Sequence, residues 1–83
     1  MPYTYIVQCA DGTFYTGWTV DLEKRLAAHN EGAGAKYTSS RIPVELVYWE
    51  RAENRSMAQK REASIKKLSR GKKVELINSF VNR

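Results

Sequence analysis

The sequence predicts an α/β fold of the α+β type, in which helices flank a small, mainly antiparallel three-stranded sheet in the order β-β-α-β-α-α. Three observations predict this class. An Asp-Gly turn separates two segments in which apolar residues alternate. A third alternating segment follows a helix-like segment, and the C-terminal part spaces its apolar residues as helices do. The chain has 83 residues, and we expect residues 1–83 to form one domain.

Local patterns place the first elements. Alternating apolar residues predict strands at residues 3–9, 13–18 and 44–50. Asp21 is a suitable N-cap for a helix that ends at His29 or Asn30. Residues 30–43 lack periodicity and are rich in Gly, Ala and Ser, so we expect a long loop there.

The two C-terminal helices are marked by capping signals. Ser56 with Gln59 fits a capping box for the first of them, although Asn54 is an alternative cap. Gly71 is a natural stop for this helix. The last helix is predicted over residues 72–81, where Val, Ile and Phe recur at helical spacing.

The register of the predicted hairpin decides where two tyrosines point. A two-residue loop places the phenols of Tyr5 and Tyr15 on opposite faces of the sheet. A three-residue loop, with Gly12 in the left-handed conformation, places both on one face and sets Gly17 opposite Tyr5. We predict the second register, because only it builds one site from both rings. The alternative is that both tyrosines are ordinary core aromatics.

The charge of the chain favours a polyanionic partner. Fourteen Lys and Arg against nine Asp and Glu give a net charge of +5. Seven basic residues lie between Lys60 and Lys73, where Glu62 is the only acid. This segment predicts a surface that contacts phosphates, including Lys66 and Lys67; the alternative is that the charge only keeps the protein soluble.

Composition also bears on compartment and chemistry. Cys9 is the only cysteine, so an internal disulfide is excluded, and no Cys/His spacing suggests structural zinc. We see no signal peptide and no run of about 20 apolar residues. The cytoplasm is therefore the expected compartment, with no membrane partner.

Three polar residues do not fit a purely structural role. In the helix that starts at Asp21, His29 shares the apolar stripe of Leu26, and Arg25 lies at its edge. Both face the sheet, either as satisfied semi-buried groups or as parts of a site. Glu62 lies at the boundary of its helix's apolar stripe. It is either a surface ion-pair partner or an oxygen ligand for a divalent cation.

These residues, taken together, resemble the GIY-YIG nuclease superfamily. The first motif matches Tyr3-Thr4-Tyr5, of which only the tyrosine is kept, and the second matches Tyr15-Thr16-Gly17. The helix signature matches residues 21–29 with Arg25 and His29, and the family's glutamate matches Glu62. Residues 32–38 and 43–48 resemble the small stand-alone bacterial members specifically. The family often carries an asparagine after the glutamate, and Asn78 is the nearest candidate.

The resemblance implies a metal-dependent endonuclease that hydrolyses phosphodiester bonds of nucleic acid, with DNA as the expected substrate. Tyr5 would be the general base and Tyr15 would fix the water. Arg25, together with a metal, would lower the pKa of Tyr5 and would neutralise charge on the phosphate. Glu62 would hold one Mg²⁺ or Mn²⁺. His29 would position Tyr15 or carry a proton.

Substrate contacts are expected from the loop, through Lys36 and Arg41. The attached DNA-reading domains of larger relatives are missing, so an unidentified protein partner is one possible source of specificity. A second hypothesis is a non-catalytic module that binds DNA or RNA on the same scaffold. A third is a protein-interaction adaptor whose charge is incidental.

Overall fold

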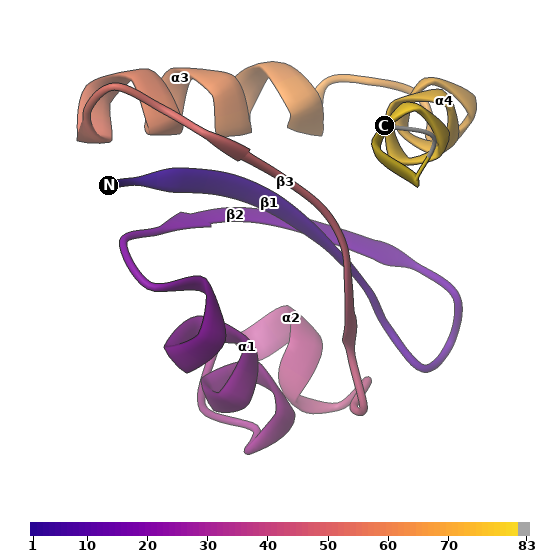
Figure 1. Cartoon of the computed structure of the whole chain (residues 1–83). Coiled ribbons are helices and arrows are strands. Elements are labelled where there is room, and N and C mark those ends of the chain that lie inside the picture. Colours follow the sequence, from indigo (N-terminus) through magenta and orange to yellow (C-terminus); the bar gives the residue numbers. More distant parts are fainter. Residues whose placement is uncertain (82–83) are drawn as a thin grey trace.

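The computed structural model describes residues 1–81 and contains one three-stranded antiparallel sheet in the order β2-β1-β3. Helices α1 and α2 cover one face of this sheet, and α3 and α4 cover the other (Figure 1). In chain order the elements are β1 (Tyr3–Gln8), β2 (Phe14–Thr19), α1 (Leu22–Asn30), α2 (Lys36–Ser39), β3 (Glu45–Arg51), α3 (Arg55–Lys66) and α4 (Arg70–Val81). The predicted class and order are confirmed, with one short helix added.

The hairpin adopts the predicted three-residue loop. Tyr5 pairs with Gly17 and Val7 pairs with Tyr15, so both phenols lie on the α1 face of the sheet. Gly12 has φ +85°, a conformation that glycine adopts without a steric penalty. Tyr15 lies on β2, an outer strand of the sheet, whereas Tyr5 lies on β1, the central strand.

Two apolar clusters hold the layers together. On the α1 face the buried residues are Tyr5, Val7, Cys9 and Val44. On the other face Ile6 and Ile65 are fully buried, and Tyr48, Leu68, Ile77 and Phe80 pack around them. Full burial of an isoleucine contributes about 1.5–3 kcal/mol, so this pair makes a large contribution to the stability of a chain of this size. Within residues 1–81, no helix is long and apolar enough to cross a bilayer.

Capping geometry confirms one predicted helix start and corrects two other boundaries. Asp21 caps α1, and its side chain accepts a hydrogen bond of 3.1 Å from the Lys24 amide. The capping box at Ser56 is wrong, because Asn54 caps α3 and accepts from the Met57 amide at 2.9 Å. The predicted stop at Gly71 is also wrong.

Gly71 lies inside α4, which begins at Arg70, whereas α3 has already ended at Lys66. The Ser69 hydroxyl accepts a hydrogen bond from the Lys72 amide at 3.2 Å, as the side chain of an N-cap does. Ser69 therefore caps the start of α4, and Gly71 falls inside this helix. The helix boundary therefore follows the available cap.

The predicted loop of residues 30–43 contains α2. This helix has four residues and no side-chain cap, so it leaves no periodic signal in the sequence. The side chain of Asn30 closes the segment. Its amide group donates to the Val44 carbonyl at 3.1 Å, and its carbonyl group accepts from the Val44 amide at 2.6 Å. These bonds join the two ends of the segment that carries α2, and α2 packs against α1.

Candidate active site

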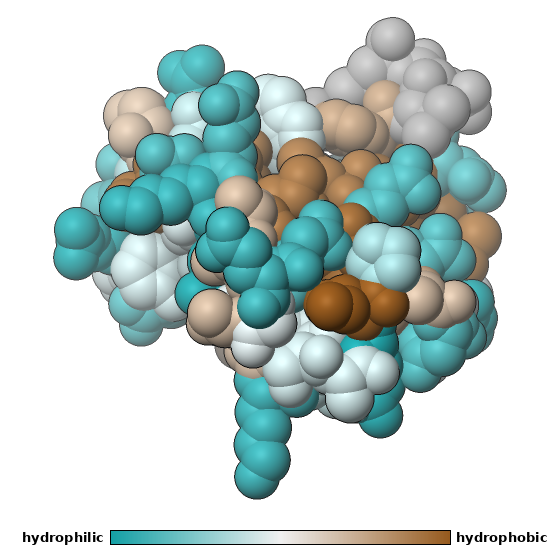
Figure 2. Space-filling model, turned by 90° about the horizontal axis from the view of Figure 1, so that it is seen from below, coloured by the Kyte–Doolittle hydropathy of each residue, from teal (hydrophilic) through white to brown (hydrophobic). Residues whose placement is uncertain are grey.

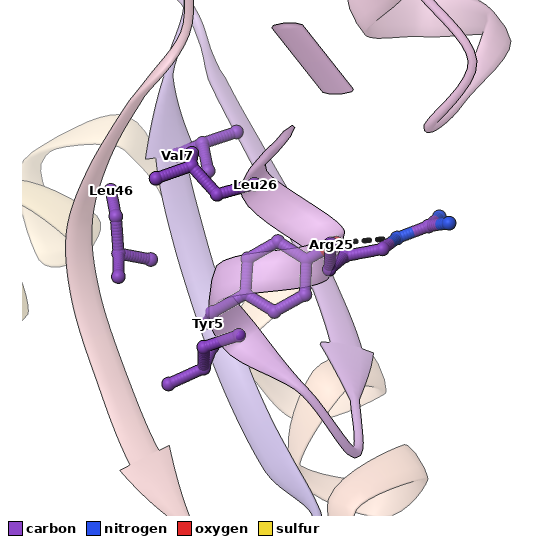
Figure 3. A pocket seen from close by; sticks show the side chains of 6 residues that line it. Tyr5, Val7, Arg25, Leu26 and Leu46 are labelled. Carbon is purple, nitrogen blue, oxygen red and sulfur yellow. Dashed lines mark hydrogen bonds between the residues drawn. The ribbon is translucent and has the colours of Figure 1, made fainter. Parts of the chain in front are cut away.

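The centre of the candidate site is the phenol of Tyr5 on β1. This side chain is 2% exposed, and its hydroxyl lies 2.8 Å from Nε2 of His29. The Nε atom of Arg25 donates to the same hydroxyl at 3.3 Å. Figure 3 shows Tyr5 and Arg25 side by side, with Val7, Leu26 and Leu46 forming an apolar wall. Helix α1 therefore brings a cation and an imidazole to one hydroxyl.

His29 is fully buried and belongs to a chain of hydrogen bonds. Its Nδ1 atom lies 2.8 Å from the hydroxyl of Thr38, and this hydroxyl donates to the Ala35 carbonyl at 3.1 Å. Because the single proton of the threonine is used on Ala35, the network assigns the ring proton of His29 to Nδ1. Nε2 then accepts from the Tyr5 hydroxyl, and the imidazole can receive that proton.

Two glycines make room for this arrangement. A Cβ atom on Gly17 would lie 2.6 Å from the Tyr5 hydroxyl oxygen and 3.2 Å from the Tyr15 ring. A Cβ atom on Gly34 would lie 2.7 Å from the Cα atom of His29. Both distances of less than 3 Å are too short for non-bonded carbon and oxygen atoms. The site therefore requires residues without a side chain at positions 17 and 34, one on each side of the Tyr5–His29 pair.

Tyr15 is the second phenol of the site. Its ring meets the His29 ring edge-on at a centroid distance of 5.4 Å, and it stacks on Tyr37 at 6.0 Å with an interplanar angle of 21°. The ammonium group of Lys66 lies 5.8 Å from the Tyr15 ring centroid. Tyr15 is thus fixed between α1, α2 and α3, at the edge of the sheet.

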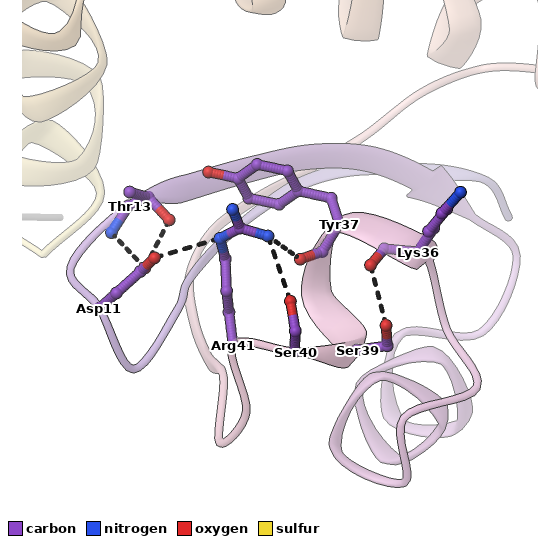
Figure 4. A network of polar contacts seen from close by, with 7 residues as sticks. All are labelled: Asp11, Thr13, Lys36, Tyr37, Ser39, Ser40 and Arg41. Carbon is purple, nitrogen blue, oxygen red and sulfur yellow. Dashed lines mark hydrogen bonds and ion pairs between the residues drawn. The ribbon is translucent and has the colours of Figure 1, made fainter.

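A polar network fastens α2 to the β1–β2 hairpin (Figure 4). The guanidinium of Arg41 lies 4.0 Å from the Tyr37 ring centroid, donates to the Tyr37 carbonyl at 2.7 Å and pairs with Asp11 at 3.1 Å. Hydrogen bonds from Thr13, reinforced by Arg41, hold the pKa of Asp11 below its usual value. The contacts of Arg41 are structural, and its predicted contact with nucleic acid stays a prediction.

Glu62 on α3 lies on the other side of the sheet edge. Its side chain is 22% exposed and forms a 3.5 Å ion pair with Lys66. Its negative charge is the smallest of the influences that raise the pKa of Tyr5, after burial and the charge of Tyr15. The ion pair with Lys66 fits the first interpretation of Glu62 from the sequence, and its role as a metal ligand stays a prediction.

The donor set suits a hard cation bound largely by its substrate. Within residues 1–81, no group of three or more His, Cys, Asp and Glu side chains could hold a metal ion. Mg²⁺ commonly binds through one or two carboxylates, with water and substrate phosphate oxygens as its other ligands. A site with Glu62 as its single carboxylate ligand fits that pattern, whereas a zinc site would require more protein ligands.

The pKa values of the central residues follow from burial and from the cation. Burial raises the pKa of Tyr5 and outweighs the opposing effect of Arg25. Arg25 by itself therefore does not bring this pKa below its ordinary value, and the lowering expected from Arg25 together with a metal stays a prediction. Burial, with a smaller effect of Arg25, lowers the pKa of His29, so its imidazole is neutral at pH 7. The hydrogen bond to Tyr5 raises the pKa of Arg25, which stays cationic.

The other predicted residues lie at varying distances from this centre. Lys66 reaches Tyr15, as described above. Lys36 is exposed on α2, Lys67 is exposed at the C-cap of α3, and Asn78 is exposed on α4. The predicted substrate contacts of these three residues, like the predicted catalytic roles, stay predictions.

Sequence reasoning missed three residues that shape the site: Gly34, Tyr37 and Thr38. All three lie in residues 32–38, the segment that resembles small family members, but they carry neither charge nor periodicity. The only available signal for Thr38 was that a buried His29 needs a hydrogen-bond partner. Thr38 becomes that partner through helix α2, which the sequence did not predict.

The stability of the fold should depend on His29 near neutral pH. Its folded-state pKa lies below the unfolded value of about 6.5, so the unfolded chain binds more protons between these two pKa values. Stability is then complete above about pH 6.5 and falls as pH drops through the folded pKa. We expect urea midpoints to decrease between about pH 7 and pH 5.

His29 is the only histidine, so a His29→Gln variant should show a flatter midpoint profile over the same range. An equal slope in that variant would assign the effect to other groups.

Comparisons with known proteins agree with this geometry. Residues 1–75 match the family model described as the GIY-YIG catalytic domain. The UPF0213 protein CPE1444 of Clostridium perfringens is 58% identical over 79 residues, which cover 95% of this chain and 85% of that protein. A UPF0213 protein of Syntrophus aciditrophicus is 58% identical over 82 residues, covering 98% and 94%.

Two solution NMR structures have similar folds. Protein EF2693 of E. faecalis has a TM-score of 0.63 and 43% identity, covering 98% of this chain and 86% of that one. The UPF0213 protein BH0048 of Bacillus halodurans has a TM-score of 0.60 and 42% identity, covering 94% and 84%.

Proposed function

Since the chain belongs to the GIY-YIG family, and to its small UPF0213 branch, we propose that it is a metal-dependent endonuclease that hydrolyses phosphodiester bonds of DNA. The observation that carries the proposal is the hydrogen-bonded array of Arg25, Tyr5, His29 and Thr38 on the α1 face of the sheet. Family membership supports the nuclease class, and the array supplies groups for its chemistry.

The general base is Tyr5 coupled to His29. A tyrosine with a raised pKa holds its proton at pH 7 and is a poor base alone. Here the Tyr5 hydroxyl donates to neutral His29, which can accept that proton as the phenol takes one from the attacking water. The Nδ1–H group, held by Thr38, keeps the imidazole in the accepting tautomer.

Arg25 and Tyr15 prepare the substrate. The Arg25 guanidinium stabilises the phenolate character of Tyr5 through Nε and presents its remaining N–H groups to a phosphate. Its fixed charge opposes the negative charge that develops on the phosphate in the transition state. Tyr15, held by three helices, positions the attacking water by its hydroxyl.

Glu62 is the residue that would hold Mg²⁺ or Mn²⁺. When bound, such a cation supplies charge relief on the phosphate and on the leaving oxygen. The carboxylate oxygens of Glu62 are the ligand type that these cations prefer. The ion pair with Lys66 costs little to break, because both side chains are partly exposed.

A groove beside Tyr15 suits a polyanion. Its volume is about 250 Å³, and it is lined by Phe14, Tyr15, Thr16, Tyr37, Lys66 and Lys73. Lysines over aromatic rings bind phosphates next to a stacking surface, which is typical of nucleic-acid sites. On the face of the molecule that carries α1 and α2, hydrophilic residues surround a smaller hydrophobic area (Figure 2). Cys9 is a free, buried thiol, and free thiols are typical of proteins in the reducing cytoplasm.

The test is cleavage of supercoiled plasmid with Mg²⁺ or Mn²⁺, with and without EDTA. We expect metal-dependent nicking by the purified chain and none by a Tyr5→Phe variant, which lacks the hydroxyl that bonds Arg25 and His29. Equal nicking by both would reveal a contaminating nuclease or a different base.

The groove also favours the second candidate, a module that binds nucleic acid without cutting it. Salt-sensitive DNA binding, without nicking in any metal, would select that function.

A further inference from the structure

A second groove lies at the other end of β2. Its volume is about 240 Å³, and it is lined by Trp18, Thr19, Val20, Arg25 and Arg55. Arg25 comes from α1 and Arg55 from the first turn of α3, so the two cations approach from opposite layers of the fold. The groove shares Arg25 with the candidate active site and therefore opens directly beside it.

The charges of this groove are suited to an anion. Among the residues that the structure describes, its lining contains two guanidinium groups and no carboxylate. Within residues 1–81, Arg55 forms no ion pair with an acidic side chain, and Nε of Arg25 is bonded to the neutral Tyr5 phenol. Two like charges that face one space repel each other unless an anion lies between them. Guanidinium groups bind phosphate through paired N–H groups.

The apolar part of the groove is suited to a base. Trp18 is half-buried on β2, and the adjacent Val20 is 50% exposed. An indole at the edge of a basic groove is a stacking surface for any unpaired base, since every base has a π face. A paired base inside a duplex has both faces covered by its neighbours and cannot use Trp18 in this way.

We propose that this groove binds an unpaired nucleotide next to the phosphate that is cleaved, with its base on Trp18 and its phosphate on Arg55. The inference rests on the proposed function for the position of the cleaved phosphate, but the binding itself requires no metal and no chemistry. It predicts that the protein prefers DNA that carries a single-stranded extension over the same duplex with blunt ends.

The binding test uses fluorescently labelled duplexes in EDTA, one with a short single-stranded extension and one blunt, measured by anisotropy. A Trp18→Leu variant keeps an apolar side chain but loses the aromatic plane. Its affinity for the extended duplex should fall by about 5- to 150-fold, the range measured for one stacked base, with less than about twofold change for the blunt duplex. An extension of abasic nucleotides should bind the wild type and the variant equally.

Arg55→Gln should reduce the salt dependence of binding by about one phosphate contact. The matched control is Arg51→Gln, which removes an exposed arginine from β3, the opposite edge of the sheet, and should leave the salt dependence unchanged. Equal effects of the two variants would show that Arg55 adds only net charge.

Fluorescence provides a measurement that does not depend on a deleterious variant. The chain has two tryptophans, so Trp49→Phe leaves Trp18 as the only one and keeps an aromatic ring against Tyr3 and Phe80. Trp18 emission should be quenched by the extended duplex and not by its abasic form. Unchanged emission on binding, or an equal loss of affinity for both duplexes in Trp18→Leu, overturns the proposal. Cleavage without quenching would refute only this inference, and quenching without cleavage would refute only the nuclease function.

Discussion

Replacement of Glu62 by glutamine should slow metal-dependent cleavage by about 1,000-fold or more, because a bound cation supplies several kcal/mol of transition-state stabilisation. The amide keeps the size of the side chain and removes the charge that a hard cation requires. The fold should be unaffected, since the ion pair lost within residues 1–81 is the partly exposed one with Lys66. The measurements are initial nicking rates at saturating Mn²⁺ and calorimetric titration of the metal in the presence of DNA.

DNA binding separates loss of chemistry from loss of substrate. In EDTA, Glu62→Gln should bind DNA at least as tightly as the wild type, because the substitution removes a negative charge from a basic surface. The matched control is Glu75→Gln. Glu75 forms an ion pair of the same length, 3.5 Å, with Lys72 on α4, but its side chain is 71% exposed. Glu75→Gln should cut at the wild-type rate. Cleavage by Glu62→Gln within about threefold of the wild type would refute the metal assignment.

The hairpin shows how far local sequence rules reach. The Asp11-Gly12 turn left a two-residue and a three-residue loop open, and the requirement for one site selected the register that the structure confirms. The stripe of helix α1 similarly placed Arg25 and His29 against the sheet, where they meet Tyr5. These residues were predictable because a strand repeats every two residues and a helix every 3.6.

The partner of His29 was not predictable by such rules. Thr38 reaches the imidazole from α2, whose position depends on Asn30 and on the Arg41–Asp11 pair, contacts between residues distant in sequence. Arg55 was missed for a related reason. It lines the same groove as Arg25 beside β2, and only the stacking of helices on both faces of the sheet places the two residues there. Periodicity describes one helix or strand at a time and carries no information on how residues from different elements are brought together.

Gly17→Ala should reduce cleavage by about 100-fold or more, the second large effect expected. The new methyl group would lie 2.6 Å from the Tyr5 hydroxyl oxygen and 2.9 Å from Cζ, and the phenol cannot retreat easily because His29 and Arg25 hold it. A displacement of about 1 Å in a catalytic group is sufficient for a rate loss of this size. Overpacking should also lower the free energy of unfolding by about 1–3 kcal/mol, measurable by urea titration.

The control for this substitution is another glycine with free space around it. Gly71 lies in α4, where a new Cβ atom would be 4.0 Å from its nearest neighbour, the hydroxyl of Ser69. Gly71→Ala should therefore raise the free energy of unfolding by up to about 1 kcal/mol, through helix propensity, and leave cleavage unchanged. The contrast distinguishes a steric effect at Tyr5 from a general effect of alanine. If Gly17→Ala cut as fast as Gly71→Ala, the hydroxyl of Tyr5 could move without loss, and a role for it as the positioned base would be untenable.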